Sequence, residues 1–219
     1  MIRVMIVDDQ EMIRVGLRTM LEAHPDIEVA AEAGDGLLAL RLLENTPVDV
    51  VLMDIRMPGI DGVEATRRIR NAYPADQVRI VVLTTFDHDD NVFAALRAGA
   101  NGFLGKGVGP AELTGAVIEV ATGGGALTPA AAAALIEHVA RDAGTRPEPE
   151  IARLFEALTP REREIVAAVV SGLDNAEIAA RMSVSPFTVK THANRAMTKV
   201  GARDRAQLVT LAFRAGIRP

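Results

Sequence analysis

The sequence predicts an α/β domain with a parallel sheet, followed by a small all-α domain, and three observations carry this prediction. Over residues 1–122, apolar β-branched runs alternate with helical patterns, which is typical of a parallel sheet with helices on both faces. After RDAGTRPEPE (141–150), a stretch rich in Pro, Gly and charge, only helical patterns occur. Charge divides in the same way, with a net −9 over residues 1–140 and +5 over residues 151–219. We therefore expect two modules with different partners.

The apolar runs and the helical patterns locate the elements of the first module in chain order. Five strands are expected at 2–7, 27–31, 48–53, 78–84 and 102–104. Five helices are expected near 11–23, 36–45, 61–72, 89–99 and 110–122, the last of them stopped by Gly123–Gly125.

The third run raises a chemical question. It is apolar from Val50 to Met53, as in a strand buried on both faces, and then ends on the carboxylate of Asp54. Burying an unpaired charge is costly. Either the strand has emerged into solvent at this point, or something binds the carboxylate.

The second module begins after a linker and reads as helical throughout. An alanine-rich stretch within the linker, Pro129–Ala140, is also expected to be helical. Three helix starts carry N-terminal capping signatures: Thr159-Pro160 with Glu162, Asp174 with Glu177, and Ser185-Pro186. A last helix is expected at about 204–214, ending before Gly216.

Composition excludes several classes of site. Cysteine is absent, so there is neither a disulfide framework nor a thiolate metal site. No apolar run is long enough to span a membrane, and none near the start resembles a signal peptide. A cytoplasmic location with no membrane partner is the expectation.

Charged and hydroxyl side chains follow four of the five expected strands: Asp8, Asp9, Asp54, Thr84 and Lys106. In a parallel sheet these strand ends meet at one edge, where ligands bind. Three carboxylates in one pocket repel each other unless a cation joins them, and oxygen-only ligation favours Mg²⁺. Any one of these residues alone would more often be a helix cap or a solvated side chain. The whole set predicts a site that forms and holds an acyl phosphate.

The stretches MIRVMIVDDQ, VVLMDIRMPGIDG, IVVLTTFD and GANGFLGKG resemble the receiver domain of bacterial two-component response regulators. The resemblance covers about residues 1–122 and implies a flavodoxin-like five-stranded sheet of order 2-1-3-4-5. It implies that Asp54 is the phosphoacceptor, and that the backbone carbonyl of Arg56 joins Asp8, Asp9 and Asp54 in holding Mg²⁺. It also implies switch roles for Thr84 and Phe103 and a phosphate-binding role for Lys106.

A helix begun at Pro186 separates two faces. Advancing 100° per residue puts one set of polar side chains on a single arc, suited to phosphates and to base edges in a major groove: Lys190, Thr191, Asn194, Arg195 and Thr198. The opposite, packing arc holds Val189, Ala193, Ala196, Met197 and Val200. A short turn joins this helix to the one before it, which is helix-turn-helix spacing. An ordinary amphipathic helix with a solvated face is the simpler alternative.

Residues 158–216 are similar to the LuxR-type helix-turn-helix. The resemblance implies that Lys190 and Thr191 enter the groove with Asn194 and Arg195 on the same face. Lys199 is either a DNA-backbone contact or a surface charge. The helix at 204–214 looks like the family's dimerisation helix, with Leu208, Leu211 and Ala212 as its apolar candidates.

Together the halves resemble a response regulator of the NarL/FixJ subfamily. We expect a receiver at 1–122, a linker at 123–153 and a DNA-binding domain at 154–219. A sensor histidine kinase is expected to phosphorylate Asp54, promoting a homodimer that binds two half-sites in promoter DNA, with RNA polymerase a candidate further partner. Such a receiver catalyses only its own phosphoryl transfer and dephosphorylation.

Two alternatives stay open at the level of the sequence. One is a DNA-binding regulator whose receiver binds a ligand or partner and takes no phosphate. The other is an aspartyl-phosphate phosphotransferase, although such haloacid-dehalogenase-like enzymes carry a second Asp where this chain has Arg56.

Overall fold

The computed structural model describes the chain except residues 85–89, 124–125, 128–146 and 219, so the helix expected over Pro129–Ala140 lies outside the described residues. The chain divides into two compact units, Met1–Ala126 and Leu127–Pro219. No helix in the described part of the chain is long and apolar enough to cross a membrane.

The first unit is built on a parallel sheet. Its strands are β1 (Ile2–Val7), β2 (Ile27–Ala33), β3 (Val50–Asp54), β4 (Arg79–Thr84) and β5 (Gly102–Gly105). The order β2-β1-β3-β4-β5 confirms the expected topology, and a two-residue strand, β6 (Ala126–Leu127), adds an edge beside β5. A strand this short leaves no periodic signal in the sequence.

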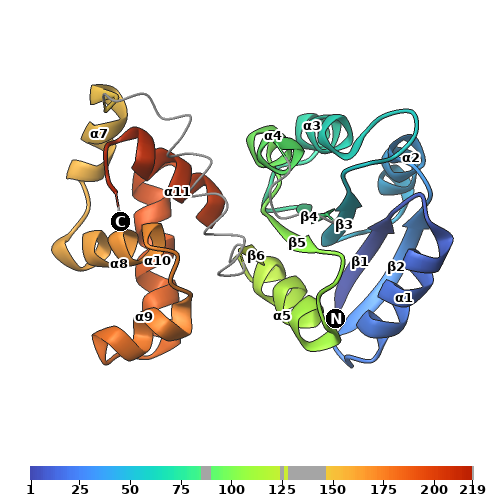
Figure 1. Ribbon diagram of the computed structural model, residues 1–219, viewed down its shortest axis with the longest axis horizontal. Helices are drawn as coiled ribbons and strands as arrows, with labels where there is room; N and C mark the ends of the chain where they lie inside the picture. Colours follow the sequence, from blue (N-terminus) through green and yellow to red (C-terminus); the bar gives the residue numbers. More distant parts are fainter. Residues whose placement is uncertain (85–89, 124–125, 128–146, 219) are drawn as a thin grey trace. The chain divides into compact units, whose positions relative to one another are not determined.

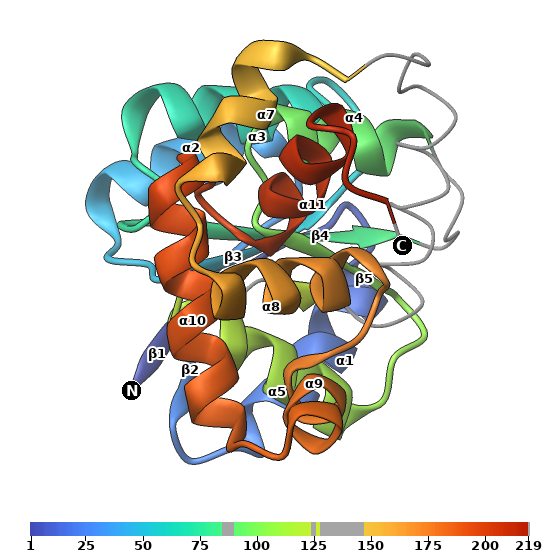
Figure 2. The ribbon, with the colours of Figure 1, turned by 90° about the vertical axis from the view of Figure 1, so that its left-hand side faces the viewer.

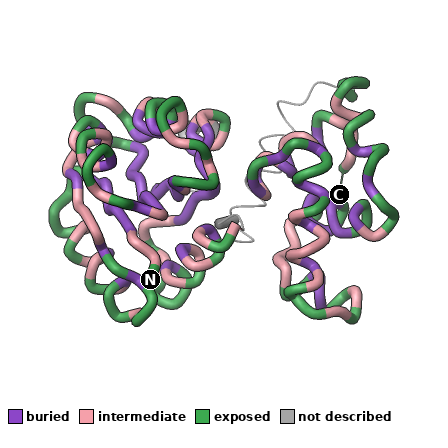
Figure 3. Tube along the Cα trace, turned by 180° about the vertical axis from the view of Figure 1, so that it is seen from behind, coloured by how far each residue is buried: buried purple, intermediate pink, exposed green. Residues whose placement is uncertain are grey.

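Helices cover both faces of the sheet, as expected (Figure 1). One face carries α1 (Glu11–Glu22) and α5 (Pro110–Ala121), whose apolar side chains pack on the strands in one core cluster. The other face carries α2 (Gly36–Asn45), α3 (Gly62–Ala72) and α4 (Asp90–Ala98). The strands between these layers are the most buried part of the unit (Figure 3).

The second unit is helical: α7 (Pro149–Glu156), α8 (Pro160–Val170), α9 (Asn175–Met182), α10 (Pro186–Val200) and α11 (Arg205–Arg214). The capping boxes at Thr159 and Asp174 both form, and Ser185 caps α10 through the backbone N–H of Thr188. Helix α7 begins inside the segment expected to be linker and packs against α10 and α11.

A tight turn joins α9 to α10 (Figure 2). Ser183 ends α9 in the left-handed conformation with φ 53°, and the N–H of Val184 donates to the Ala179 carbonyl at 3.1 Å. These bonds satisfy the last carbonyls of α9 and let α10 leave at once in a new direction. Helix α10 then packs on α8, α9 and α11.

Candidate functional site

The carboxyl edge of the sheet brings three carboxylates together. Asp8 follows β1 and Asp54 ends β3, and their exposed fractions are only 0% and 4%. Asp9 is exposed to solvent. One oxygen from each of the three lies within 4.8 Å of the others. Strand β3 therefore does not emerge into solvent at Asp54, and the carboxylate needs a partner.

Lys106 is that partner. Its ammonium lies 2.6 Å from Asp8 Oδ2 and 2.9 Å from Asp54 Oδ2, and its side chain is only 8% exposed. Burial raises the pKa of Asp54, with the charge of Asp8 acting in the same direction, while Lys106 and the backbone N–H of Arg56 oppose the rise. Burial disfavours the ammonium as well, but its hydrogen bonds to Asp8 and Asp54 outweigh this and raise the pKa of Lys106. One cation thus neutralises part of a crowded anionic pocket.

The β1–α1 turn is braced from two sides. The backbone N–H of Gln10 donates to Asp8 Oδ1 at 2.9 Å. The guanidinium of Arg14 donates to the backbone carbonyl of Asp8 at 2.8 Å, and its Nε lies 3.5 Å from Glu32 of β2. Arg14 therefore helps to position the acidic turn without touching its carboxylates.

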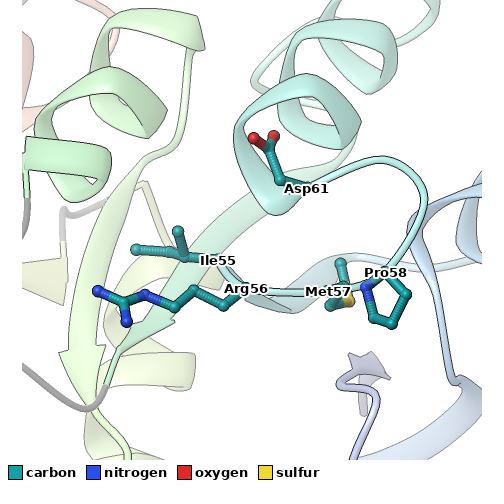
Figure 4. Close-up of a pocket in the computed structure, with 5 residues that line it drawn as sticks. All are labelled: Ile55, Arg56, Met57, Pro58 and Asp61. Atoms are coloured by element: carbon teal, nitrogen blue, oxygen red, sulfur yellow. The ribbon is translucent and has the colours of Figure 1, made fainter.

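The β3–α3 loop approaches the end of β3 closely. The N–H of Gly62 donates to the Ile55 carbonyl at 2.9 Å. A Cβ placed on Gly62 would lie only 2.1 Å from the backbone oxygen of Asp54. A pocket of about 240 Å³ opens over this loop, lined by Ile55, Arg56, Met57, Pro58 and Asp61 (Figure 4). The side chain of Arg56 extends away from Met57 and Pro58 (Figure 4).

The remaining receiver residues lie on β4 and β5. Thr84 is buried at the end of β4, and its carbonyl accepts the backbone N–H of Lys106 at 2.7 Å. Phe103 on β5 is 1% exposed. The aromatic ring is therefore already inward, and a rotation of this side chain would require a second, outward state.

The predicted packing face of α10 is observed. Val189, Ala193, Ala196, Met197 and Val200 are all buried. Lys190, Thr191 and Asn194 are partly exposed, and Arg195 is exposed. No acidic residue occurs in α10 (PFTVKTHANRAMTKV), so the polar groups of this face are cations, amides and hydroxyls.

Comparison with known families decides the identity of the chain. Residues 4–118 match the response regulator receiver domain, and residues 156–212 match the bacterial regulatory proteins of the luxR family. The chain is a response regulator. It carries a LuxR-type helix-turn-helix domain and is a phosphorylation-regulated transcriptional regulator, not a conventional enzyme.

Relatives of the response regulator match along nearly its whole length. It is 40% identical over 216 residues to the transcriptional regulatory protein YxjL of Bacillus subtilis (strain 168), covering 99% of this chain and 97% of that one. It is 38% identical over 214 residues to LiaR of the same organism, covering 98% of each. The crystal structure of ChrA, the response regulator of a heme-sensing two-component system, matches with a TM-score of 0.53 and 36% identity, covering 99% of this chain and 98% of that one.

The structure gives Lys199 of the response regulator an internal partner. Its ammonium lies 2.7 Å from Glu162 Oε2, on a carboxylate whose side chain is 4% exposed. The hydrogen bond from Lys199 lowers the pKa of Glu162 to about 2, against the opposing effect of burial and with help from Thr159. Lys199 thus ties α10 to the first turn of α8. Neither role expected from the sequence, a DNA-backbone contact or a surface charge, includes this ion pair.

The three residues expected at a dimer interface differ in how exposed they are on α11. Leu208 and Ala212 are 0% exposed in the single chain, because α11 packs them against the other helices of its own unit. Of the three candidates in the regulator, only Leu211 is partly exposed.

Two supporting residues of the regulator were missed by the sequence reasoning. Arg14 was missed because nothing in its helical pattern indicates a hydrogen bond to the Asp8 carbonyl. Gly62 follows Asp61 in VVLMDIRMPGIDG, where a glycine at a helix start is the available signal. The reason why position 62 requires a glycine is the close approach of its backbone to Asp54, and this approach is visible only in three dimensions.

Proposed function

We propose that Asp54 accepts a phosphoryl group from a sensor histidine kinase. The observation that carries this proposal is the buried Lys106 ammonium, held within 2.9 Å of both Asp8 and Asp54 at the carboxyl edge of the sheet. In the transfer, an Asp54 oxygen attacks phosphorus, the P–N bond to the kinase histidine breaks, and the imidazole leaves with the bonding electron pair. Lys106 then has phosphoryl oxygens as well as carboxylates to neutralise.

The carboxylates fit a bound Mg²⁺. The acidic oxygens lie within 4.8 Å of one another, close to the spacing of about 4 Å across an octahedral Mg²⁺ site. Asp8, Asp9, Asp54 and the backbone carbonyl of Arg56 are the proposed ligands. When bound, the ion offsets negative charge on the phosphoryl group. Exposed Asp9 is the ligand with most freedom to adjust.

The switch we propose passes from the phosphoryl group to Thr84. The Thr84 hydroxyl moves to the phosphoryl oxygens, which favours the inward position of Phe103 on the neighbouring strand over an outward one. The population then shifts toward a state in which homodimers form and α10 is available to DNA. Of the dimerisation candidates on α11, Leu211 is partly exposed and so has surface available to a second chain.

The DNA surface we propose is the polar face of α10. Lys190, Thr191, Asn194 and Arg195 lie on it, and two copies would read two half-sites of a promoter. Recruitment of RNA polymerase is a candidate outcome. Promoter DNA and RNA polymerase, as partners, favour a cytoplasmic location.

Intact mass and DNA binding after treatment with acetyl phosphate and Mg²⁺ test the proposal. We expect the mass of one phosphoryl group on the wild-type chain and tighter binding to duplex DNA, and neither for Asp54→Asn. Asp76→Asn is a matched control, because Asp76 is exposed in the loop before β4 at the opposite edge of the sheet. If acetyl phosphate and a panel of histidine kinases both leave the mass unchanged while DNA binding persists, the regulator is independent of phosphate.

A further inference from the structure

Phe187, the second residue of α10, is a large apolar side chain in solvent. It is 79% exposed, whereas the other exposed large apolar residue described in this unit, Leu154 of α7, is 41% exposed. Single exposed apolar side chains are common on protein surfaces. Exposure alone therefore assigns no role to Phe187. Its role has to be inferred from its position on the helix.

The helical register puts Phe187 on the polar face of α10. Lys190, Thr191 and Asn194 follow it by three, four and seven positions, so the four side chains share one face. The hydroxyl of Thr191 donates to the Phe187 carbonyl at 2.9 Å, which ties the two successive turns of this face together. Phe187 thus continues the proposed DNA surface toward the N-terminus of the helix.

The chemistry around Phe187 restricts what it can contact. A recognition helix touches base edges chiefly with its N-terminal residues, and Phe187 lies at that end. The groups beside it are cations, hydroxyls and an amide, with no acidic residue in the helix, which complements a polyanion. In the major groove, the apolar feature on a base edge is the C5-methyl group of thymine.

We infer that Phe187 is a specificity-determining residue that packs on thymine methyl groups in the major groove. This inference rests on the proposed DNA-binding function of α10. It adds an apolar readout to a face that otherwise offers only hydrogen bonds and charge. A site bound by this regulator should therefore contain thymine opposite the N-terminal turn of α10.

Replacing thymine by deoxyuridine tests this directly, because the exchange removes only the C5-methyl group. The probe is a duplex selected from a random-sequence library by the full chain after acetyl phosphate treatment. Each thymine in it is then replaced singly, and binding is measured by fluorescence anisotropy. We expect about fourfold weaker binding at one or two positions in each half-site, the factor for burying one methyl-sized apolar group.

Variants assign the effect to the side chain. Phe187→Ala should bind the thymine duplex more weakly and no longer distinguish deoxyuridine at those positions. Leu154→Ala removes the other exposed large apolar side chain described in this unit and should keep the discrimination. Equal binding of thymine and deoxyuridine duplexes by the wild type overturns the inference, as does discrimination that survives Phe187→Ala.

Lys190→Ala separates failure of the inference from failure of the proposed DNA surface. If it weakens binding to every duplex while the wild type ignores the methyl groups, the DNA surface stands and the role of Phe187 is wrong. If neither Lys190→Ala nor Phe187→Ala changes binding, or if the library yields no bound duplex, the DNA surface on α10 is wrong and the inference fails with it.

Discussion

Replacing Lys106 by Met should strongly destabilise the receiver unit. The substitution keeps most of the side-chain volume and removes the charge that holds Asp8 and Asp54 together. Two carboxylates with exposed fractions of 0% and 4% then face each other without a cation. Breaking a buried ion pair on one side leaves an uncompensated charge, which costs far more than losing a surface pair.

The distances set the magnitude. At an effective dielectric constant of about 20, charges 2.6 and 2.9 Å apart attract by roughly 6 kcal/mol each. Several kcal/mol of this are offset in the wild type by the cost of taking the ammonium out of water. We expect the free energy of unfolding to fall by about 3–5 kcal/mol, the range for buried pairs broken on one side.

Urea unfolding followed by tyrosine fluorescence is the assay. The chain has one tyrosine and no tryptophan, and Tyr73 lies in the receiver unit with its hydroxyl donating to the Leu43 carbonyl at 3.2 Å. The signal therefore reports on the receiver within the full chain. Lys190→Met makes the same chemical change in the other unit and should leave the tyrosine transition unchanged.

Three further results should accompany the loss of stability in Lys106→Met. Asp54→Asn should restore part of the stability in the Lys106→Met background, because it removes one of the two opposed charges. Millimolar Mg²⁺ should stabilise Lys106→Met more than the wild type. Because the pKa of Asp54 is raised in the folded state, its ionisation costs stability as pH rises, so the variant should recover on mild acidification. A loss below about 1 kcal/mol would refute the reasoning, since that is the behaviour of a solvent-screened pair.

Two other predictions concern contacts between elements. The pKa of Glu162 is lowered to about 2 from 4.5, so its stabilisation is complete above pH 4.5 and is lost as pH falls toward 2. Hydrogen exchange of α8 and α10 should show that the free energy of unfolding falls by about 2 kcal/mol across this pH range, a value that allows for screening at the partly exposed Lys199. The fall should be shallower in Lys199→Met. Parallel pH profiles for the two proteins would contradict the pairing. Gly62→Ala should cost about 1–3 kcal/mol and slow phosphorylation of Asp54, since the new Cβ meets backbone 2.1 Å away. Gly16→Ala, a helical position with nothing within 4 Å, should stabilise the same unit by about 0.5–1 kcal/mol; losses of similar size in the two variants would show that crowding is not the cause.

The sequence by itself determined the local features of this protein. Strand β1 and helix α2 begin and end where the patterns predicted, and the Thr159 and Asp174 capping boxes form as expected. Such features depend on residues a few positions apart, so periodicity and capping chemistry are sufficient to predict them. The convergence of Asp8, Asp54 and Lys106 was also predictable, because parallel strands bring their carboxyl ends to one edge.

Only the tertiary structure decided which partner each side chain meets. Lys199 contacts Glu162, 37 positions away, and no local pattern encodes that distance. Leu208 and Ala212 form an apolar face that either a second chain or the rest of the same chain could cover. In this structure the other helices of the same unit cover both residues. An amphipathic pattern shows that a face is buried but not what buries it. The close approach of Gly62 to Asp54 likewise exists only once β3 and α3 are packed together.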